Sequence, residues 1–574
     1  VENADSASVA SETNQETPVK RDEDAATATG NAAETNPSGG DTPDNDNAEE
    51  TTAGGDGVDK PKDWQAKIDD AFGTWIVNPI VSVFFYPIAT VEAQQQLRDQ
   101  ATGNLEVNED GSPKLTTIPV GIPIVVVWLF CGGVFLTLRM MFINFRAFRH
   151  SIDLIRGKYD DPDKEEAGDV THFQALSAAL SATVGLGNIG GVAVAIGLGG
   201  PGAAFWIALV GFIGMTTKFA ECTLGQLYRT TDANGNVLGG PMRYLNVGLA
   251  EKGPILAALG KVLSVVFAVI CIGASFGGGN SYQINQSLAA ISQNVTFFQE
   301  NGWVYGLIMA GMVAAVIIGG IKSIGAVASK VVPSMCLLYM LVSLAILGLN
   351  VFKIPDAIGL IFQGAFSPDA IYGGAVGVLI LGVKRAVFSN EAGVGSAAIA
   401  HSAAKTDEPV SEGIVALLEP FIDTVVVCTT TALVIIVTGV YQGDQNGLII
   451  VKEEGAALTL AAFNSVSPYA GYLLSVAVVL FAFSTCISWS YYGERSFVQL
   501  FGEKSSIIYK VLFVIATFLG AVITAKNVLV FSDLMILGLS FPNLLGVFIL
   551  SGVVKRELDK YWAKYKSGEL KRFG

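Results

Sequence analysis

Residues 181–191 read SATVGLGNIGG, and residues 389–397 read SNEAGVGSA. Both stretches contain the pattern S-x-x-x-G-x-G, and the second begins 208 residues after the first. Each lies near the middle of a long apolar run, where a helix would ordinarily continue. Paired glycines favour local unwinding, because a glycine in a helix interior is about 1 kcal/mol less favourable than alanine. The two stretches therefore predict a pair of interrupted helices.

The composition of the whole chain indicates a membrane protein. Of its 574 residues, 51% are apolar and only 15% are charged, whereas soluble domains carry about 25% charged residues. An apolar run of about 20 residues can cross the roughly 30 Å of hydrocarbon in a bilayer. We therefore expect an all-α polytopic membrane protein. Its eleven predicted spans are residues 118–141, 171–198, 201–226, 258–290, 303–321, 327–350, 371–404, 411–440, 468–491, 507–525 and 528–552.

Charge and hydropathy divide the chain into four parts. Residues 1–62 hold fifteen acidic and four basic residues and almost no large apolar side chains, which predicts a disordered acidic tail. Residues 63–117 are predicted to form an interfacial or re-entrant segment and a loop, with a span at 72–91 as the less favoured alternative. Residues 118–554 form the predicted transmembrane domain. Residues 555–574 form a basic tail.

The basic residues of the loops predict the orientation of the chain. Lysine and arginine follow the first, third, fifth, seventh and ninth predicted spans, while the alternate loops contain few. Because positive loops stay in the cytoplasm, we expect the C-terminus inside and the acidic N-terminal tail outside. The expected location is the bacterial inner membrane, and nothing in the sequence supports nucleic-acid binding.

The two glycine stretches also mark an internal repeat. Each begins a set of five predicted spans, over residues 171–350 and 371–552. Because five is odd, the second set enters the membrane inverted relative to the first, as in many transporters. One G-x-G alone would favour close helix packing, but two matched copies with polar side chains favour broken helices. We therefore predict a five-plus-five inverted repeat, preceded by one peripheral helix.

The free backbone groups at a broken helix indicate which ligands the two stretches bind. Unwound backbone inside a bilayer is tolerated only where it lines a polar cavity. Free N–H groups at the start of a half-helix attract an anion, while free carbonyls at the end of the preceding half-helix suit Na⁺. A zwitterionic amino acid together with Na⁺ would use both ends.

Several strings then resemble a known family. The string VGLGN at 184–188 is similar to the unwound first core helix of the leucine-transporter (LeuT) fold. The chain resembles the alanine or glycine:cation symporters more closely. The matching stretches are HFQAL at 172–176, TVGLGNIGG at 183–191, GPG at 200–202 and FSNEAGVGS at 388–396. The resemblance runs from about residue 118 to 552. It implies a LeuT-like fold with broken first and sixth core helices, and symport of alanine or glycine with Na⁺ as the coupling ion and no other cofactor.

The resemblance also implies a substrate site at the two breaks. Backbone N–H groups of Leu186 and Gly187 would bind the substrate carboxylate, because the helix breaks at Gly185 and Gly187. The carbonyl of Thr183 and the backbones of Phe388 and Ser389 would bind its ammonium group. These expectations place the amino acid between residues of the second and seventh predicted spans.

The same resemblance implies positions for sodium. The first ion would lie between the carbonyls of Ser181 and Val184 and the hydroxyls of Ser484 and Thr485. Asn188 and Ser389 match ligands of a second sodium site found in some relatives.

Other residues are candidates on the sequence alone. Trp489 follows Thr485 by four residues, on the same helix face, and would cap the pocket unless it is an interfacial tryptophan. Gln283 belongs to an amide cluster with Asn280 and Asn285 that is expected to face the cavity. Charged residues in or near the membrane default to function or to internal pairing, and they are Lys384, Arg385, Glu391, Asp423 and Asp533.

Three other functions compete with sodium-coupled transport. A channel would ordinarily repeat its pore lining by subunit symmetry, and an enzyme would need a nucleophile with a base or a set of metal ligands. Neither pattern is evident, so we expect a transporter and no enzymatic activity. The main alternative is proton coupling through Glu391, whose burial would favour protonation.

Overall fold

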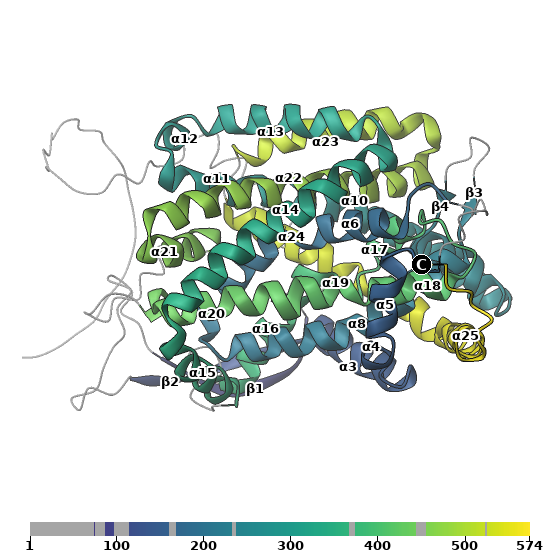
Figure 1. The fold of residues 1–574 in the computed structure, drawn as a ribbon, viewed down its shortest axis with the longest axis horizontal. Helices are drawn as coiled ribbons and strands as arrows, with labels where there is room; N and C mark the ends of the chain where they lie inside the picture. The colour runs from purple at the N-terminus through teal and green to yellow at the C-terminus, as the bar shows by residue number, and fades with distance from the viewer. Residues whose placement is uncertain are drawn as a thin grey trace, which may run out of the picture. The chain divides into compact units, whose positions relative to one another are not determined.

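The computed structural model describes residue 74 and residues 86–96, 114–159, 168–231, 237–366, 374–442, 455–522 and 525–573. All of these belong to one compact unit, Pro61–Gly574, which is mostly helical (Figure 1). The predicted tail at 1–62 and most of the predicted segment 63–117 lie outside the described residues.

The described residues confirm a polytopic helical membrane protein. Judged by length and composition, six helical runs can cross a membrane, or seven if one bent pair counts as a single span. Helices also underlie each of the eleven predicted apolar runs. The count of eleven spans itself stays a prediction.

The first half of the chain contains both small sheets and the first broken helix. Its elements are β1 (Pro87–Gln96), β2 (Leu115–Pro123), α3 (Ile124–Arg139), α4 (Ile143–Arg146), α5 (Phe148–Ile155), α6 (His172–Thr183), η2 (Gly187–Gly191), α7 (Val192–Gly199), α8 (Ala203–Leu227), β3 (Thr230–Thr231), β4 (Val237–Leu238), α9 (Pro241–Arg243), η3 (Tyr244–Gly248), α10 (Pro254–Phe276), η4 (Gly277–Ser281), α11 (Tyr282–Asn294), α12 (Phe297–Glu300), α13 (Gly302–Ile317), α14 (Gly320–Leu349) and η5 (Val351–Lys353).

In the second half, every regular element that the structure describes is a helix. Its elements are α15 (Ile354–Phe366), α16 (Gly374–Asn390), α17 (Ala397–His401), α18 (Pro409–Ala416), α19 (Leu418–Pro420), η6 (Phe421–Cys428), α20 (Thr429–Thr438), η7 (Val440–Gln442), α21 (Ala456–Val466), α22 (Pro468–Phe501), η8 (Glu503–Ser505), α23 (Ser506–Gly520), α24 (Ala525–Gly538) and α25 (Ser540–Ser567).

The segment before α3 departs from the all-α prediction. Strands β1 and β2 pair antiparallel, with Val91 opposite Val120, and β3 pairs with β4. The predicted first span at 118–141 therefore begins as a strand, and its helix starts only at Ile124. Pro123 explains the boundary, because proline tolerates the start of a helix but cannot donate a hydrogen bond within one.

The first predicted break is present between α6 and η2. Helix α6 begins with a capping box, in which Thr171 and Gln174 exchange side-chain-to-backbone hydrogen bonds. It ends at Thr183, because Val184 has a ψ of 84° and leaves the helical region. Helical structure resumes at Gly187, and the two halves are bent by 48°.

The second predicted break is present between α16 and α17. Three residues between these helices have positive φ: Glu391 at 55°, Gly393 at 92° and Gly395 at 86°. Glycine adopts this conformation without steric cost, which explains the second pair of glycines. Glu391 has a side chain and adopts it nonetheless, so the surrounding contacts must hold it there.

Long helices pack around both breaks (Figure 1). Helix α22 contacts α6, α10, α11 and α14, and α8 contacts α16, α18 and α3. Two helices, α15 and α21, lie in stretches that the sequence predicted as loops. The predicted basic tail also differs, since α25 continues through it to Ser567 and buries Leu558 and Tyr561.

Candidate functional site

The backbone donors at the first break have side-chain partners. The N–H of Gly185 donates to Oδ1 of Asn188 at 2.9 Å, and the N–H of Leu186 donates to Oε1 of Gln283 at 3.1 Å. Gln283 also donates from Nε2 to the carbonyl of Gly278 at 2.8 Å. Two of the donors that a break leaves free are therefore satisfied within the protein, including one that was predicted to bind a carboxylate.

The two breaks face each other and α22. A Cβ added at Gly187 would lie 3.2 Å from Cδ1 of Phe388 and 3.4 Å from Cα of Ser389. A Cβ added at Gly185 would lie 2.5 Å from Oγ1 of Thr485. The structure thus brings together five predicted site residues from three helical segments that are far apart in the sequence.

Two of the predicted sodium ligands, Ser181 and Ser484, contact each other. The hydroxyl of Ser181 donates to the carbonyl of Ser484 at 2.6 Å, which joins the end of α6 to α22. Ser484 donates its own proton to the carbonyl of Phe481 at 3.0 Å, and Val184 is fully buried. Oγ1 of Thr485 is buried and has no hydrogen-bond partner in the part of the chain that is described. Six other buried hydroxyls among the described residues share this feature, so what distinguishes Thr485 is its place beside the unwound backbone at Gly185.

A buried carboxylate joins the two residues of the predicted second sodium site. Asn188 donates from Nδ2 to the carbonyl of Asp423 at 3.0 Å and also to its carboxylate. Ser389 donates to Oδ2 of Asp423 at 2.8 Å, and Thr424 donates to the same oxygen at 2.6 Å. Asp423 is fully buried, and no ion pair is found for it among the described residues. The sequence signal was an isolated acid in an apolar run, but nothing in the sequence gave its partners.

Trp489 and Glu391 contact each other across the second break. The indole N–H of Trp489 donates to Oε1 of Glu391 at 2.9 Å, and Ser396 donates to the other carboxylate oxygen. Trp489 is only 1% exposed and packs against Gly279 in η4, just before α11. Its position is therefore internal, and its contact with Glu391 explains how the unusual backbone of that residue is held.

The remaining predicted substrate residues also lie at the breaks. Phe388 packs edge-on against Tyr282, with ring centroids 5.1 Å apart, and Arg385 lies 5.6 Å from its ring. The hydroxyl of Thr183 donates back to the carbonyl of Ala179 at 3.2 Å, so it is used within α6.

Three π-helical segments surround this region. They are η2, which contains Gly187 and Asn188, η4, which precedes Gln283, and η6, which contains Asp423. Wide turns of this kind occur mostly as short insertions, frequently at functional sites.

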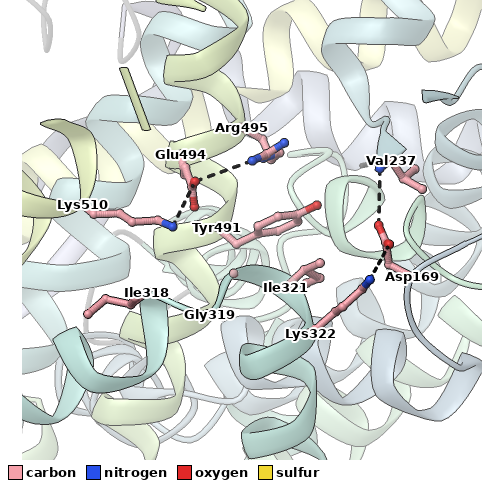
Figure 2. Close-up of a pocket in the computed structure, with 11 residues that line it drawn as sticks. Asp169, Val237, Ile318, Gly319, Ile321, Lys322, Tyr491, Glu494, Arg495 and Lys510 are labelled. Atoms are coloured by element: carbon pink, nitrogen blue, oxygen red, sulfur yellow. Dashed lines mark hydrogen bonds and ion pairs between the residues drawn. The ribbon is translucent and has the colours of Figure 1, made fainter. Parts of the chain in front are cut away.

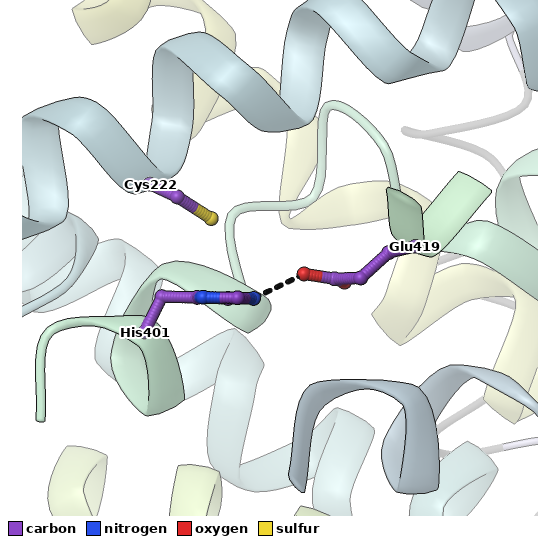
Figure 3. Close-up of side chains that lie close together, drawn as sticks. All are labelled: Cys222, His401 and Glu419. Carbon is purple, nitrogen blue, oxygen red and sulfur yellow. Dashed lines mark hydrogen bonds and ion pairs between the residues drawn. The ribbon is translucent and has the colours of Figure 1, made fainter. Parts of the chain in front are cut away.

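A second buried polar cluster lies apart from the predicted site residues (Figure 3). Ligand atoms of Cys222, His401 and Glu419 lie within 4.8 Å of one another, which is close enough to hold a metal ion. However, Nζ of Lys218 lies 3.2 Å from Glu419, and both ring nitrogens of His401 already face carboxylates. A neighbouring cation and an occupied imidazole both disfavour a metal, so the group forms a buried ion-pair network.

One charged pocket opens near this cluster (Figure 2). Asp169, Lys322, Tyr491, Glu494, Arg495 and Lys510 contribute side chains to it. Its charges are paired across the cavity, with Lys322 3.5 Å from Asp169 and Lys510 3.3 Å from Glu494. The pocket is therefore polar and nearly balanced in charge.

Known proteins resemble the chain over the same region. Residues 112–574 match the model of the sodium:alanine symporter family. The chain is 43% identical to the sodium/alanine symporter AgcS of Methanococcus maripaludis, over 76% of this chain and 94% of that protein. It is 34% identical to the putative sodium/proton-dependent alanine carrier protein YrbD of Bacillus subtilis, over 78% and 91%. It is 33% identical to the probable sodium/glutamine symporter GlnT of the same organism, over 78% and 89%.

Proposed function

Because the chain belongs to the sodium:alanine symporter family, we propose that it couples the movement of alanine or glycine to that of Na⁺ by alternating access. The observation that carries this proposal is the meeting of two broken helices beside a buried hydroxyl and a buried carboxylate. One cation entering down about 100 mV supplies about 2.3 kcal/mol. A tenfold sodium gradient adds about 1.4 kcal/mol, so one ion is enough to concentrate an uncharged solute several-hundred-fold.

The proposed architecture is the LeuT-like inverted repeat with eleven spans. Two observations support it: each predicted apolar run contains a helix, and the two glycine stretches at the breaks are 208 residues apart. The acidic tail then lies outside and the C-terminus lies in the cytoplasm. A single cysteine placed at residue 40 is expected to react only with impermeant reagents added from outside. Labelling only from the cytoplasmic side would require one more span, at 72–91.

We place the substrate carboxylate at the N–H groups of Leu186 and Gly187. In the structure, Oε1 of Gln283 accepts the hydrogen bond from the N–H of Leu186 at 3.1 Å. A substrate carboxylate oxygen would take the place of Oε1. The ammonium group would then lie toward Thr183, Phe388 and Ser389. Space for the amino-acid side chain is limited by the ring of Phe388 and by Trp489 behind Glu391.

Competition by alanine methyl ester tests this carboxylate site. The ester keeps the ammonium group and the methyl side chain but lacks the anion, so it is expected not to inhibit uptake of labelled alanine. Glycine should compete, whereas leucine, phenylalanine and charged amino acids should compete poorly. Inhibition by the ester as strong as that by unlabelled alanine would place the carboxylate elsewhere.

The first sodium site is proposed at Ser181, Val184, Ser484 and Thr485. Support comes from the unpartnered Oγ1 of Thr485 beside the unwound backbone at Gly185. A hard cation prefers oxygen ligands, and a hydroxyl that has no partner among the described residues loses no hydrogen bond by turning toward an ion.

Substituting Thr485 tests this site directly. Thr485→Ala is expected to raise the Na⁺ concentration for half-maximal alanine uptake severalfold, because one ligand is lost while the helix is kept. Thr485→Ser retains the hydroxyl and should remain close to the unmodified protein. Equal sodium dependence in the alanine and serine variants would remove Thr485 from the ion site.

Uptake of radiolabelled alanine into proteoliposomes tests the function as a whole. We expect uptake with Na⁺ outside and loss of uptake when K⁺ replaces it at a fixed pH gradient. Proton coupling is the second candidate, favoured by the buried carboxylates of Asp423 and Glu391. Accumulation that follows the pH gradient and ignores Na⁺ would select it.

A further inference from the structure

The ends of the two broken helices are tied together beside the pocket of Figure 2. Val170 lies opposite Ala404 in an isolated parallel bridge, and the N–H of Lys405 donates to the carbonyl of Val170 at 2.8 Å. The N–H of Asp169 donates to the carbonyl of Ala403, also at 2.8 Å. The chain that enters α6 is therefore joined by its backbone to the chain that leaves α17.

One buried carboxylate joins the same two helices through side chains. Glu412, in the first turn of α18, accepts a hydrogen bond from His172, the first residue of α6. Its other oxygen, Oε1, lies 2.5 Å from Nδ1 of His401, the last residue of α17. Each oxygen of one fully buried carboxylate thus holds one broken helix.

Glu412 belongs to a larger group of buried charged residues. Both ring nitrogens of His401 face carboxylates, one on Glu412 and one on Glu419, and an imidazole donates from both nitrogens only as the cation. Lys218, 3.2 Å from Glu419, supplies the second positive charge. Glu412 and Glu419 are therefore held together with His172, His401 and Lys218 as one buried group, and removing one member leaves a buried charged partner without its contact.

The pocket ends at this junction. Asp169, whose backbone forms part of the tie, also lines the pocket, as Ile321 does (Figure 2). Tyr491, another lining residue, follows Thr485 by six residues, which is about 9 Å along α22. The pocket therefore begins about 9 Å along α22 from Thr485, and the joined ends of α6 and α17 border it.

We propose that Glu412, with His172 and His401, is a releasable clamp on the two broken helices, and that the solute passes between the breaks and this pocket when the clamp opens. This inference rests on the proposed transport function. Glu412 touches neither the proposed substrate site nor the proposed ion sites, so it is a positioning residue. Its role is to set how often the ends of α6 and α17 separate.

A reversible cross-link tests whether the ends must separate. In a chain whose native cysteines are replaced, Val170→Cys and Ala404→Cys place two thiols on bridged neighbours. Paired backbones lie about 4.7–4.9 Å apart, within the range of about 4.4–6.8 Å between Cα atoms that a disulfide needs. Oxidation is expected to reduce alanine uptake about tenfold or more, as expected when a conformational step becomes limiting. Equilibrium binding of alanine should persist, and a reductant should restore uptake. Full uptake by the cross-linked protein would overturn the clamp.

Labelling of Cys222 tests the side-chain part of the clamp. Cys222 is fully buried beside His401 and Glu419 (Figure 3), so as the only cysteine it reacts with a thiol reagent only when the cluster opens. Glu412→Gln is expected to speed its labelling about tenfold, because local opening governs access to buried groups. Asp559→Asn removes the same charge from the exposed pair with Lys555 and should leave the rate unchanged.

A second variant and a defined negative result complete the labelling test. If Glu412→Gln does not give a monodisperse protein, His172→Gln replaces it. This variant removes the imidazole that joins α6 to Glu412 and is expected to speed labelling of Cys222 as well. Labelling of Cys222 at the unmodified rate in a folded variant of either kind would overturn the clamp. Labelling needs no solute, so its outcome is independent of whether the unmodified chain takes up alanine in the same vesicles.

Discussion

Replacement of Asp423 by asparagine is expected to raise the Na⁺ concentration needed for half-maximal alanine uptake at least about tenfold. The carboxylate is fully buried and is held by Asn188, Ser389 and Thr424, all neutral donors. No ion pair is found for it among the described residues, so in its ionised form it would attract a cation. At an effective dielectric constant of about 20, a cation about 4 Å away would gain about 4 kcal/mol from that charge. Asparagine keeps the shape and removes this attraction.

The substitution also separates the two coupling candidates. If Asp423 binds Na⁺, the variant shifts sodium dependence and leaves the pH profile in place. If it carries a proton, the variant loses the pH dependence of uptake instead. Asp559→Asn, in an exposed ion pair on α25, is the control for the loss of one negative charge. A variant with both the sodium and the pH dependence of the unmodified protein would leave Asp423 with a structural role only.

Gly187→Leu is expected to lower alanine uptake about a hundredfold. A Cβ at this position already lies 3.2 Å from the Phe388 ring and 3.4 Å from the backbone of Ser389, so the larger leucine must displace the second break. Overpacking of this kind costs about 1–3 kcal/mol. Leucine also favours re-formation of the helix by about 1 kcal/mol relative to glycine, which would withdraw the N–H groups from the site.

A graded series identifies the cause of that loss. Gly187→Ala adds only the Cβ and is expected to reduce uptake less than leucine does. Gly197→Ala, in α7 on the same broken span, meets only Leu458 at 3.7 Å, an ordinary contact, and should transport normally. If Gly187→Leu transported as well as Gly197→Ala, the substrate would not approach the first break.

The helix breaks could be predicted from the sequence because glycine spacing is a local signal. The same reasoning could not supply the partners of Asp423, since its bonds to Ser389 and Asn188 join residues 34 and 235 positions apart. Such contacts depend on how whole helices pack. Gln283 was predicted to face the cavity, but only the structure shows that it accepts the Leu186 proton.

Short elements were missed for a different reason. A search for apolar runs long enough to cross a bilayer passes over α21, which has 11 residues. This helix nevertheless supports the first break, because Thr459 donates to the carbonyl of Ile189 at 3.0 Å. The strands β1 and β2 were missed because prolines and apolar residues near 118–123 read equally well as the start of a span.

The π-helical turns at η2, η4 and η6 give these helices a way to change the face that they present. Each such turn holds one residue more than an α turn. Moving that extra residue along a helix rotates the side chains in between by about 100°, the angle per residue of an α-helix. Asn188 and Asp423 both lie in such turns. A local shift in register would therefore part Asn188 from Asp423 while the helix axes remain in place, and would open the proposed ion site without moving a whole helix.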